Sequence, residues 1–176
     1  DVIAQGEYLA RAADCMACHT QDSAKPFAGG VKFELPVGTL YSTNISPDKQ
    51  QGIGNYSEAD FSRAVREGIA KEGKRLYPAM PSNAYAKLSD QDIHALYTYF
   101  MQGVKPIDQP NRDNDIPWYL AARWPLRLWN AINAPEPVST PSSPDDSDPI
   151  KRGAWLVEGP GHCGACHTPR GWMMQE

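Results

Sequence analysis

The 176-residue chain has no long hydrophobic run, no surplus of positive charge and few cysteines. No stretch approaches the roughly 18 consecutive apolar residues of a membrane-spanning helix, so the sequence predicts none. The formal net charge of -4 argues against nucleic acid as a partner. Apolar residues still make up 41% of the chain, which excludes wholesale disorder and supports a folded core.

The cysteines occur in two C-x-x-C-H motifs, and none is left over. The motifs are Cys15-Met16-Ala17-Cys18-His19 and Cys163-Gly164-Ala165-Cys166-His167. C-x-x-C-H is the attachment signal for c-type haem. Two thiols three positions apart can each form a thioether to one porphyrin vinyl group, and the adjacent histidine then reaches the iron. The sequence therefore predicts two covalent haem c groups, each held by two cysteines and ligated by one histidine.

Three other uses of paired cysteines account for less of the pattern. Disulfides would not need a histidine after each pair. Thioredoxin-like redox pairs lie in a βαβ pattern, and no such pattern surrounds these motifs. A single zinc site, as in a zinc-stabilised interaction module, would join two distant pairs and leave both histidines unexplained.

A degenerate repeat predicts two domains in tandem. Gly6-Glu7-Tyr8-Leu9 precedes the first motif, and Gly153-Ala154-Trp155-Leu156 precedes the second. We predict a first cytochrome domain over residues 1–106, a connector and linker over 107–149, and the N-terminal part of a second domain over 150–176. The linker prediction rests on residues 134–149, which are rich in proline, serine and acidic residues.

The local patterns predict a mainly α fold with extensive loops. Residues 3–14 have the apolar spacing of a helix. Ser57 with Asp60, and Ser89 with Asp92, have the spacing of capping boxes that begin two further helices. We expect the first of these to end at Gly68 or Gly73 and the second at Gly103. Residues 22–55 show little periodicity and are expected to form loops around the cofactor.

Met80 is the predicted second axial ligand of the first haem. It lies between two prolines that we expect to hold the segment extended, and it is far enough along the chain to reach the opposite face of the porphyrin. His94 projects from a predicted helix and is expected to be exposed. Met173 and Met174 are too close to His167 to cross a porphyrin, so we expect the sixth ligand of the second haem to lie after Glu176.

The chain resembles the multihaem cytochrome c subunits of bacterial membrane-bound dehydrogenases. The resemblance rests on Thr43–Asp48, Gly52–Gly54, Tyr77–Pro81, Ile116–Trp118, Arg123–Trp129 and Gly153–Arg170. These segments look like the triheme cytochrome subunit of quinoprotein alcohol dehydrogenase and of flavin-dependent gluconate or sorbitol dehydrogenases. The third C-x-x-C-H motif of that family is missing from these residues.

This resemblance implies a class I cytochrome c-like fold and an electron relay. Single electrons would pass from a catalytic subunit, which oxidises an alcohol, aldehyde or sugar acid, towards ubiquinone in the membrane. The chain would not oxidise substrate by itself. Thioether attachment takes place outside the cytoplasm, so we expect a periplasmic protein at the outer face of the inner membrane, with Asp1 as its mature N-terminus.

Two alternatives differ in the chemistry of the complex. One is the cytochrome subunit of a molybdenum hydroxylase acting on N-heterocycles or aldehydes, a family that shares much of the first domain. The resemblance of the segment Trp124–Trp129 favours the alcohol or sugar dehydrogenase type. The other is a dihaem peroxidase, which would need an open or displaceable sixth site on the iron. Trp118, Trp124 and Trp129 lie among arginines, a composition typical of interfaces, and we predict an intersubunit or interdomain role for this segment.

Overall fold

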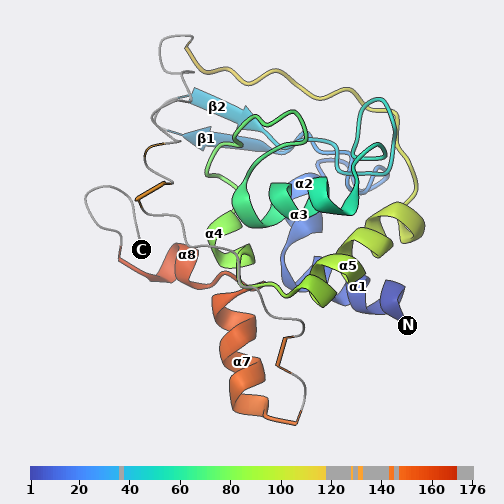
Figure 1. Ribbon diagram of the computed structural model, residues 1–176. Helices are drawn as coiled ribbons and strands as arrows, with labels where there is room; N and C mark the ends of the chain where they lie inside the picture. Colours follow the sequence, from blue (N-terminus) through green and yellow to red (C-terminus); the bar gives the residue numbers. More distant parts are fainter. Residues whose placement is uncertain (36–37, 118–127, 129–130, 133–142, 145–146, 170–176) are drawn as a thin grey trace. The chain divides into compact units, whose positions relative to one another are not determined.

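The computed structural model describes residues 1–35, 38–117, 128, 131–132, 143–144 and 147–169. It divides into two compact units, which are described separately: residues 1–57 with 95–123, and residues 58–94 with 124–176. Helices dominate the described residues, and the predicted mainly α fold is confirmed (Figure 1). The domain boundaries drawn from the sequence stay a prediction.

The first unit is built on helix α1, Val2–Ala12. The Asp1 carboxylate caps it by accepting a hydrogen bond of 3.0 Å from the backbone N–H of Ile3. The π-helical turn η1, Tyr99–Gly103, packs against α1 and continues directly from α5, Asp90–Thr98. Gly6 makes the close approach possible, since a Cβ atom there would lie 2.0 Å from the carbonyl oxygen of Ala95.

Aromatic side chains fill the core beside this helix pair. Phe27 contacts Phe100 edge to face with ring centroids 5.1 Å apart, and it contacts Tyr99 in the same manner at 6.2 Å. Phe27 and Phe100 are both almost fully buried, as is Leu9 on the inner side of α1. The burial of these large apolar side chains stabilises the unit and fixes the segment that follows the first C-x-x-C-H motif.

A β-hairpin corrects the expectation of loops throughout residues 22–55. Strands β1, Lys32–Leu35, and β2, Gly38–Tyr41, pair antiparallel (Figure 1). The backbone N–H and carbonyl of Thr39 exchange two hydrogen bonds of 2.9 Å with those of Asp115. Gly38 has a φ of +135°, a conformation that suits glycine. The sequence prediction was wrong here because the strands are short and one partner lies far along the chain.

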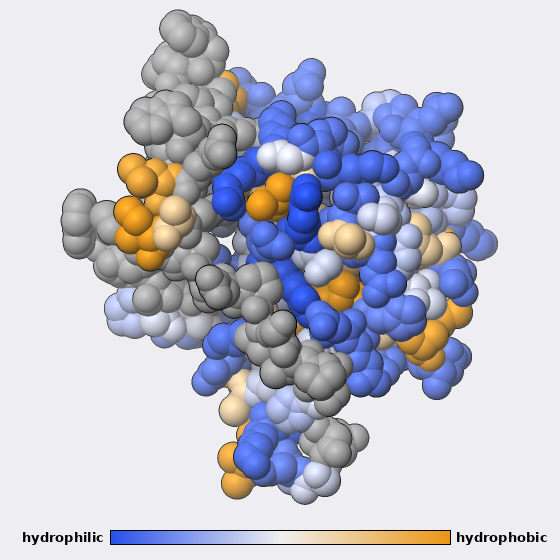
Figure 2. All heavy atoms as spheres, viewed as in Figure 1, coloured by the Kyte–Doolittle hydropathy of each residue, from blue (hydrophilic) through white to orange (hydrophobic). Residues whose placement is uncertain are grey.

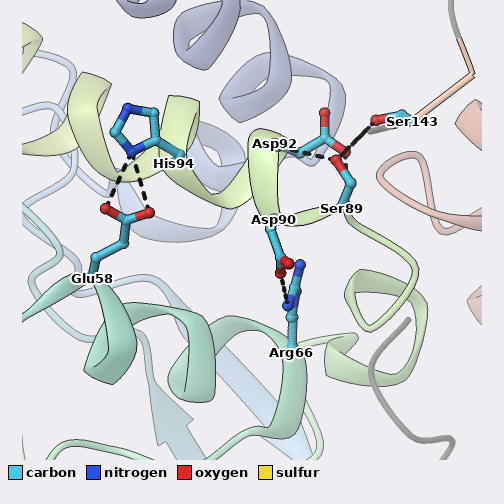
Figure 3. Close-up of polar contacts among 7 residues, drawn as sticks. All are labelled: Glu58, Arg66, Ser89, Asp90, Asp92, His94 and Ser143. Carbon is cyan, nitrogen blue, oxygen red and sulfur yellow. Dashed lines mark hydrogen bonds and ion pairs between the residues drawn. The ribbon is translucent and has the colours of Figure 1, made fainter. Parts of the chain in front are cut away.

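The second unit contains helices α3, Glu58–Glu67, and α4, Ser82–Tyr85, which pack together. Helix α3 ends at Glu67, directly before Gly68, whose φ of +64° is left-handed. The predicted start after Ser57 and stop at Gly68 are therefore confirmed. The Arg66 side chain is largely buried, and its Nη1 lies 2.8 Å from the Asp90 carboxylate at the start of α5 (Figure 3). This ion pair joins α3 to α5 within the unit.

The capping box predicted at Ser89 and Asp92 is present. The Asp92 carboxylate accepts hydrogen bonds from the Ser89 backbone N–H at 2.9 Å and hydroxyl at 2.7 Å, and the Ser89 hydroxyl accepts one from the Asp92 N–H at 3.2 Å (Figure 3). Ser143 also donates to the Asp92 carboxylate. Ser143 and Pro144 are half-buried, so these two residues depart from the solvated linker expected over 134–149.

Helix α7, Pro149–Glu158, precedes the short helix α8, Gly164–His167, which holds most of the second motif. Asp148 caps α7 by accepting a 3.1 Å hydrogen bond from the Lys151 N–H. Trp155 donates a 3.3 Å hydrogen bond from Nε1 to the carbonyl of Lys87, whose ammonium lies 3.1 Å from Glu158. Figure 2 shows hydrophobic side chains at the surface of this helix, where Ile150 and Val157 are exposed.

Gly6 and Gly153, which occupy equivalent positions in the two repeats, provide a matched test of the packing of α1. We expect Gly6→Ala to lower the free energy of unfolding by about 3 kcal/mol, because the added Cβ atom must displace the backbone of α5. Gly153 has no atom within 4 Å of an added Cβ, so Gly153→Ala should raise stability by up to about 1 kcal/mol. Urea unfolding of both variants checks this. Equal losses at the two positions would contradict the packing described for Gly6.

Candidate haem-attachment sites

The first motif lies in helix α2, Cys15–His19, which starts directly after a left-handed residue. Asp14 has a φ of +53° and turns the chain sharply between α1 and α2. Its carbonyl accepts a 3.1 Å hydrogen bond from the Cys18 N–H, which closes the first turn of α2. This local turn begins the helical segment that carries both cysteines, whose spacing suits attachment to two porphyrin vinyl groups.

The electrostatic environment keeps both thiols protonated at neutral pH. Burial raises the pKa of Cys15 to about 12, with a further contribution from Cys18, and burial also raises the pKa of Cys18. Thioredoxin-like redox pairs need the opposite shift, because the thiolate is their nucleophile. None of the four cysteines forms a disulfide in the described residues. The environment of the first motif therefore disfavours the redox-pair alternative.

One hydrogen bond decides which nitrogen of His19 is available to a metal. Nδ1 lies 2.7 Å from the backbone carbonyl oxygen of Thr43, and because a carbonyl only accepts, Nδ1 carries the hydrogen and donates it. Nε2 is then the nitrogen with a free lone pair. Burial lowers the pKa of His19, an effect that the Thr43 carbonyl partly offsets, so the imidazole is neutral and able to ligate iron.

Glycine beside the Thr43 carbonyl makes this arrangement possible. Gly29 has a φ of +76°, and a Cβ atom there would lie 2.5 Å from both the carbon and the oxygen of the Thr43 carbonyl. The Gly29 N–H also donates a 2.7 Å hydrogen bond to the carbonyl of His19. The residues of the first motif thus fit a haem c group: two thiols on one helical turn and a neutral, oriented imidazole.

The second motif repeats the local structure of the first. His162, directly before Cys163, has a left-handed φ of +38°, as Asp14 has before Cys15. The ring of His162 has two contacts. Its Nδ1 lies 2.9 Å from the carbonyl oxygen of Pro160, and the ring packs edge to face on Tyr85 with ring centroids 5.8 Å apart. Cys163 and Cys166 are exposed. A left-handed residue therefore introduces the attachment helix in both repeats.

The sequence pattern did not predict these two left-handed residues. Aspartate tolerates this conformation better than most residues, which was an available signal at position 14. No such signal exists for His162, whose ring contacts both the nearby Pro160 carbonyl and Tyr85, a residue distant in sequence. Backbone strain of this kind persists where surrounding structure enforces it, and it gathers at functional sites.

The remaining predicted ligands lie in the second unit. Met80 is half-buried, but its segment forms a turn at Pro78 and Ala79 rather than the extended chain that was expected. Proline favours this outcome because its fixed φ suits the second position of a turn.

His94 is exposed as predicted, with Nδ1 3.2 Å from both carboxylate oxygens of Glu58 (Figure 3). The tryptophans Trp118, Trp124 and Trp129, and Met173 and Met174, lie outside the described residues.

Comparison with known proteins identifies the family of the chain. The sequence profile of cytochrome c matches residues 3–103. The chain is 55% identical over 175 residues to the gluconate 2-dehydrogenase cytochrome c subunit of Pantoea cypripedii, and 53% identical over 176 residues to the alcohol dehydrogenase (quinone) cytochrome c subunit of Gluconobacter oxydans. It is 42% identical over 175 residues to a subunit of the nicotinate dehydrogenase of Pseudomonas putida.

Each alignment includes 99% of this chain, but the chain spans only 40%, 36% and 15% of these three relatives, respectively. The chain belongs to the cytochrome c family, whose members carry covalently bound haem c, and this confirms the predicted cofactor and the class I cytochrome c-like fold. Among the helices of the described residues, none has the length and apolarity needed to cross a membrane.

The left-handed turn before each motif leads to a testable expectation. Asp14→Ile should destabilise the first unit by about 1–2 kcal/mol, because a β-branched side chain strongly disfavours positive φ. Asp14→Gly should fold at least as stably as the parent at this position. Thermal unfolding and the yield of covalently attached haem measure the effect.

The same pair of substitutions at His162 serves as the control for the second motif. Isoleucine should again lower the yield of attached haem relative to glycine, through the second site alone. Indistinguishable glycine and isoleucine variants at both positions would contradict a role for the left-handed turn.

Proposed function

We propose that the chain is part of an electron-transfer cytochrome c subunit of a periplasmic dehydrogenase complex. In this role it relays single electrons from a catalytic subunit, a quinoprotein or flavoprotein that oxidises an alcohol, aldehyde or sugar acid, towards membrane ubiquinone. The observation that carries the proposal is the pair of C-x-x-C-H motifs in a chain similar throughout to subunits named for gluconate and alcohol dehydrogenases.

Seven residues hold the two cofactors in this proposal. Cys15, Cys18, His19 and Met80 bind the first haem, and Cys163, Cys166 and His167 bind the second. Bound haem c supplies one-electron chemistry between ferric and ferrous iron. The cysteines fix each porphyrin covalently, and His19 presents Nε2 because its Nδ1 is engaged by Thr43. No residue is assigned a role in oxidising substrate.

The proposed role of Met80 as the second ligand of the first haem is supported by the chemistry of its thioether and by its fixed backbone. A thioether favours ferrous iron, so a His/Met pair raises the reduction potential and closes the iron to small ligands. The backbone at Met80 is fixed by the prolines on both sides and by a 2.8 Å hydrogen bond from the Ser82 N–H to the Met80 carbonyl. Such a site suits electron transfer and disfavours the peroxidase alternative.

A second candidate differs only in the partner. The chain is also similar to a protein named for nicotinate dehydrogenase, and nicotinate is an N-heterocycle, the substrate class of the molybdenum hydroxylase alternative. In both cases the proposed location is the periplasm, at the outer face of the inner membrane, with membrane and ubiquinone contacts made by parts of the full-length protein outside this chain. The identity of the copurifying catalytic subunit separates the two candidates.

The function is tested on the complex purified from its native host through a tag on the full-length cytochrome. We expect a quinoprotein or flavoprotein dehydrogenase to copurify, and one of its alcohol or sugar-acid substrates to reduce the haems as seen in the visible spectrum. Met80→Ala should shift the potential of the first haem downward and remove that haem's share of the weak sulfur-to-iron absorption of the oxidised protein, because its thioether ligand is lost.

Met101→Ala is the matched control, since Met101 lies in η1 and is proposed to pack rather than ligate. It should leave both potentials and the sulfur-to-iron band in place. Copurification of a molybdenum hydroxylase whose N-heterocyclic substrate reduces the haems would favour the second candidate. Absence of any dehydrogenase from the complex would contradict the proposed function, and an unchanged spectrum in Met80→Ala would contradict ligation by Met80.

A further inference from the structure

The peptide group between Thr43 and Asn44 is hydrogen-bonded at both ends. Its carbonyl oxygen accepts the 2.7 Å hydrogen bond from Nδ1 of His19. Its N–H donates a 2.6 Å hydrogen bond to Oδ1 of Asn111. A single planar amide therefore connects His19 to the side chain of Asn111, a residue 67 positions beyond Asn44 in the sequence.

The orientation of this peptide is tightly determined. The Asn44 side chain is 2% exposed, and its Nδ2 donates to the carbonyls of Ile107 at 2.8 Å and Gln109 at 3.1 Å. Its Oδ1 accepts hydrogen bonds from the N–H of Ser46 at 2.9 Å and from the Ser46 hydroxyl at 2.7 Å. All hydrogen-bonding atoms of the side chain are used within the protein, so Asn44 anchors the peptide in place.

The side chain of Asn111 is oriented as well. Its Nδ2 donates a 3.2 Å hydrogen bond to the carbonyl of Gln51, which identifies Oδ1 as the atom that faces the N–H of Asn44. An acceptor on the N–H of an amide polarises the amide and makes its carbonyl a better acceptor. The short contact at Asn111 therefore strengthens the hydrogen bond that the Thr43 carbonyl receives from His19.

A stronger hydrogen bond at Nδ1 makes the imidazole of His19 more electron-rich at Nε2. An electron-rich ligand stabilises ferric iron over ferrous iron and lowers the reduction potential. We propose that Asn111 is a positioning residue that, through the Thr43–Asn44 peptide, sets the orientation and basicity of His19 and so tunes the potential of the first haem. The inference rests on the proposed role of His19 as an iron ligand.

Two substitutions of similar size to asparagine move the potential in opposite directions. Asn111→Leu removes the acceptor and should shift the potential of the first haem upward. Asn111→Asp replaces it with a stronger, charged acceptor and should shift the potential downward. Both variants lose the hydrogen bond to Gln51, so local disruption alone would move them in the same direction.

The measurement is a spectroelectrochemical titration of the full-length cytochrome, with the proton resonance of His19 Nδ1–H recorded in the ferrous protein. This resonance should move upfield in Asn111→Leu and downfield in Asn111→Asp. Asn114 is the matched control, because its Oδ1 accepts a 3.0 Å hydrogen bond from the N–H of Tyr41, on a peptide that does not contact His19. Asn114→Leu and Asn114→Asp should leave the His19 resonance unmoved.

Shifts in the same direction for both Asn111 variants, or an unmoved His19 resonance, would overturn the proposal. So would a downward shift in Asn114→Asp as large as that in Asn111→Asp, because it would trace the effect to charge alone. If Asn111→Leu does not fold, Asn111→Asp against Asn114→Asp still decides the question. Reduction of the haems by the dehydrogenase substrate is scored separately, so failure of this proposal leaves the proposed function standing.

Discussion

The hydrogen bond from His19 Nδ1 to the Thr43 carbonyl is the constraint on which the first site depends. It selects the tautomer that leaves Nε2 free, and it ties the end of α2 to a loop 24 residues further along the chain. Three neighbouring residues support this contact. Gly29 leaves room for the carbonyl, Asn44 anchors its peptide and Asn111 polarises it.

The two repeats share a local backbone structure as well as the C-x-x-C-H motif. Each begins with a helix of ten or eleven residues and turns through a left-handed residue, Asp14 or His162, into the attachment helix. At position 162 the ring contacts Pro160 and Tyr85, whereas the aspartate at position 14 tolerates a positive φ by its own nature. The recurrence of the same backbone geometry supports the interpretation of the second motif as a haem site.

The sequence could predict the features of this structure that depend on local patterns. The capping box at Ser89, the end of α3 at Gly68 and the two attachment motifs all depend on residues a few positions apart. The pairing of Thr39 with Asp115, the ring contact of His162 with Tyr85 and the hydrogen bond of Asn44 to Asn111 each join residues about seventy positions apart, which no local pattern encodes. The turn at Pro78 shows a limit of another kind, because proline is compatible with both turns and extended chain.

The central claim is that both motifs carry covalent haem, and the most direct measurement is the amount of haem c per chain. After acid-acetone extraction, the alkaline pyridine spectrum of the reduced chain should be of the two-thioether type and should correspond to two haems. A variant with Cys163→Ser and Cys166→Ser should retain one. Haem that is lost on extraction, or a parent chain with the same content as the double variant, would contradict the account.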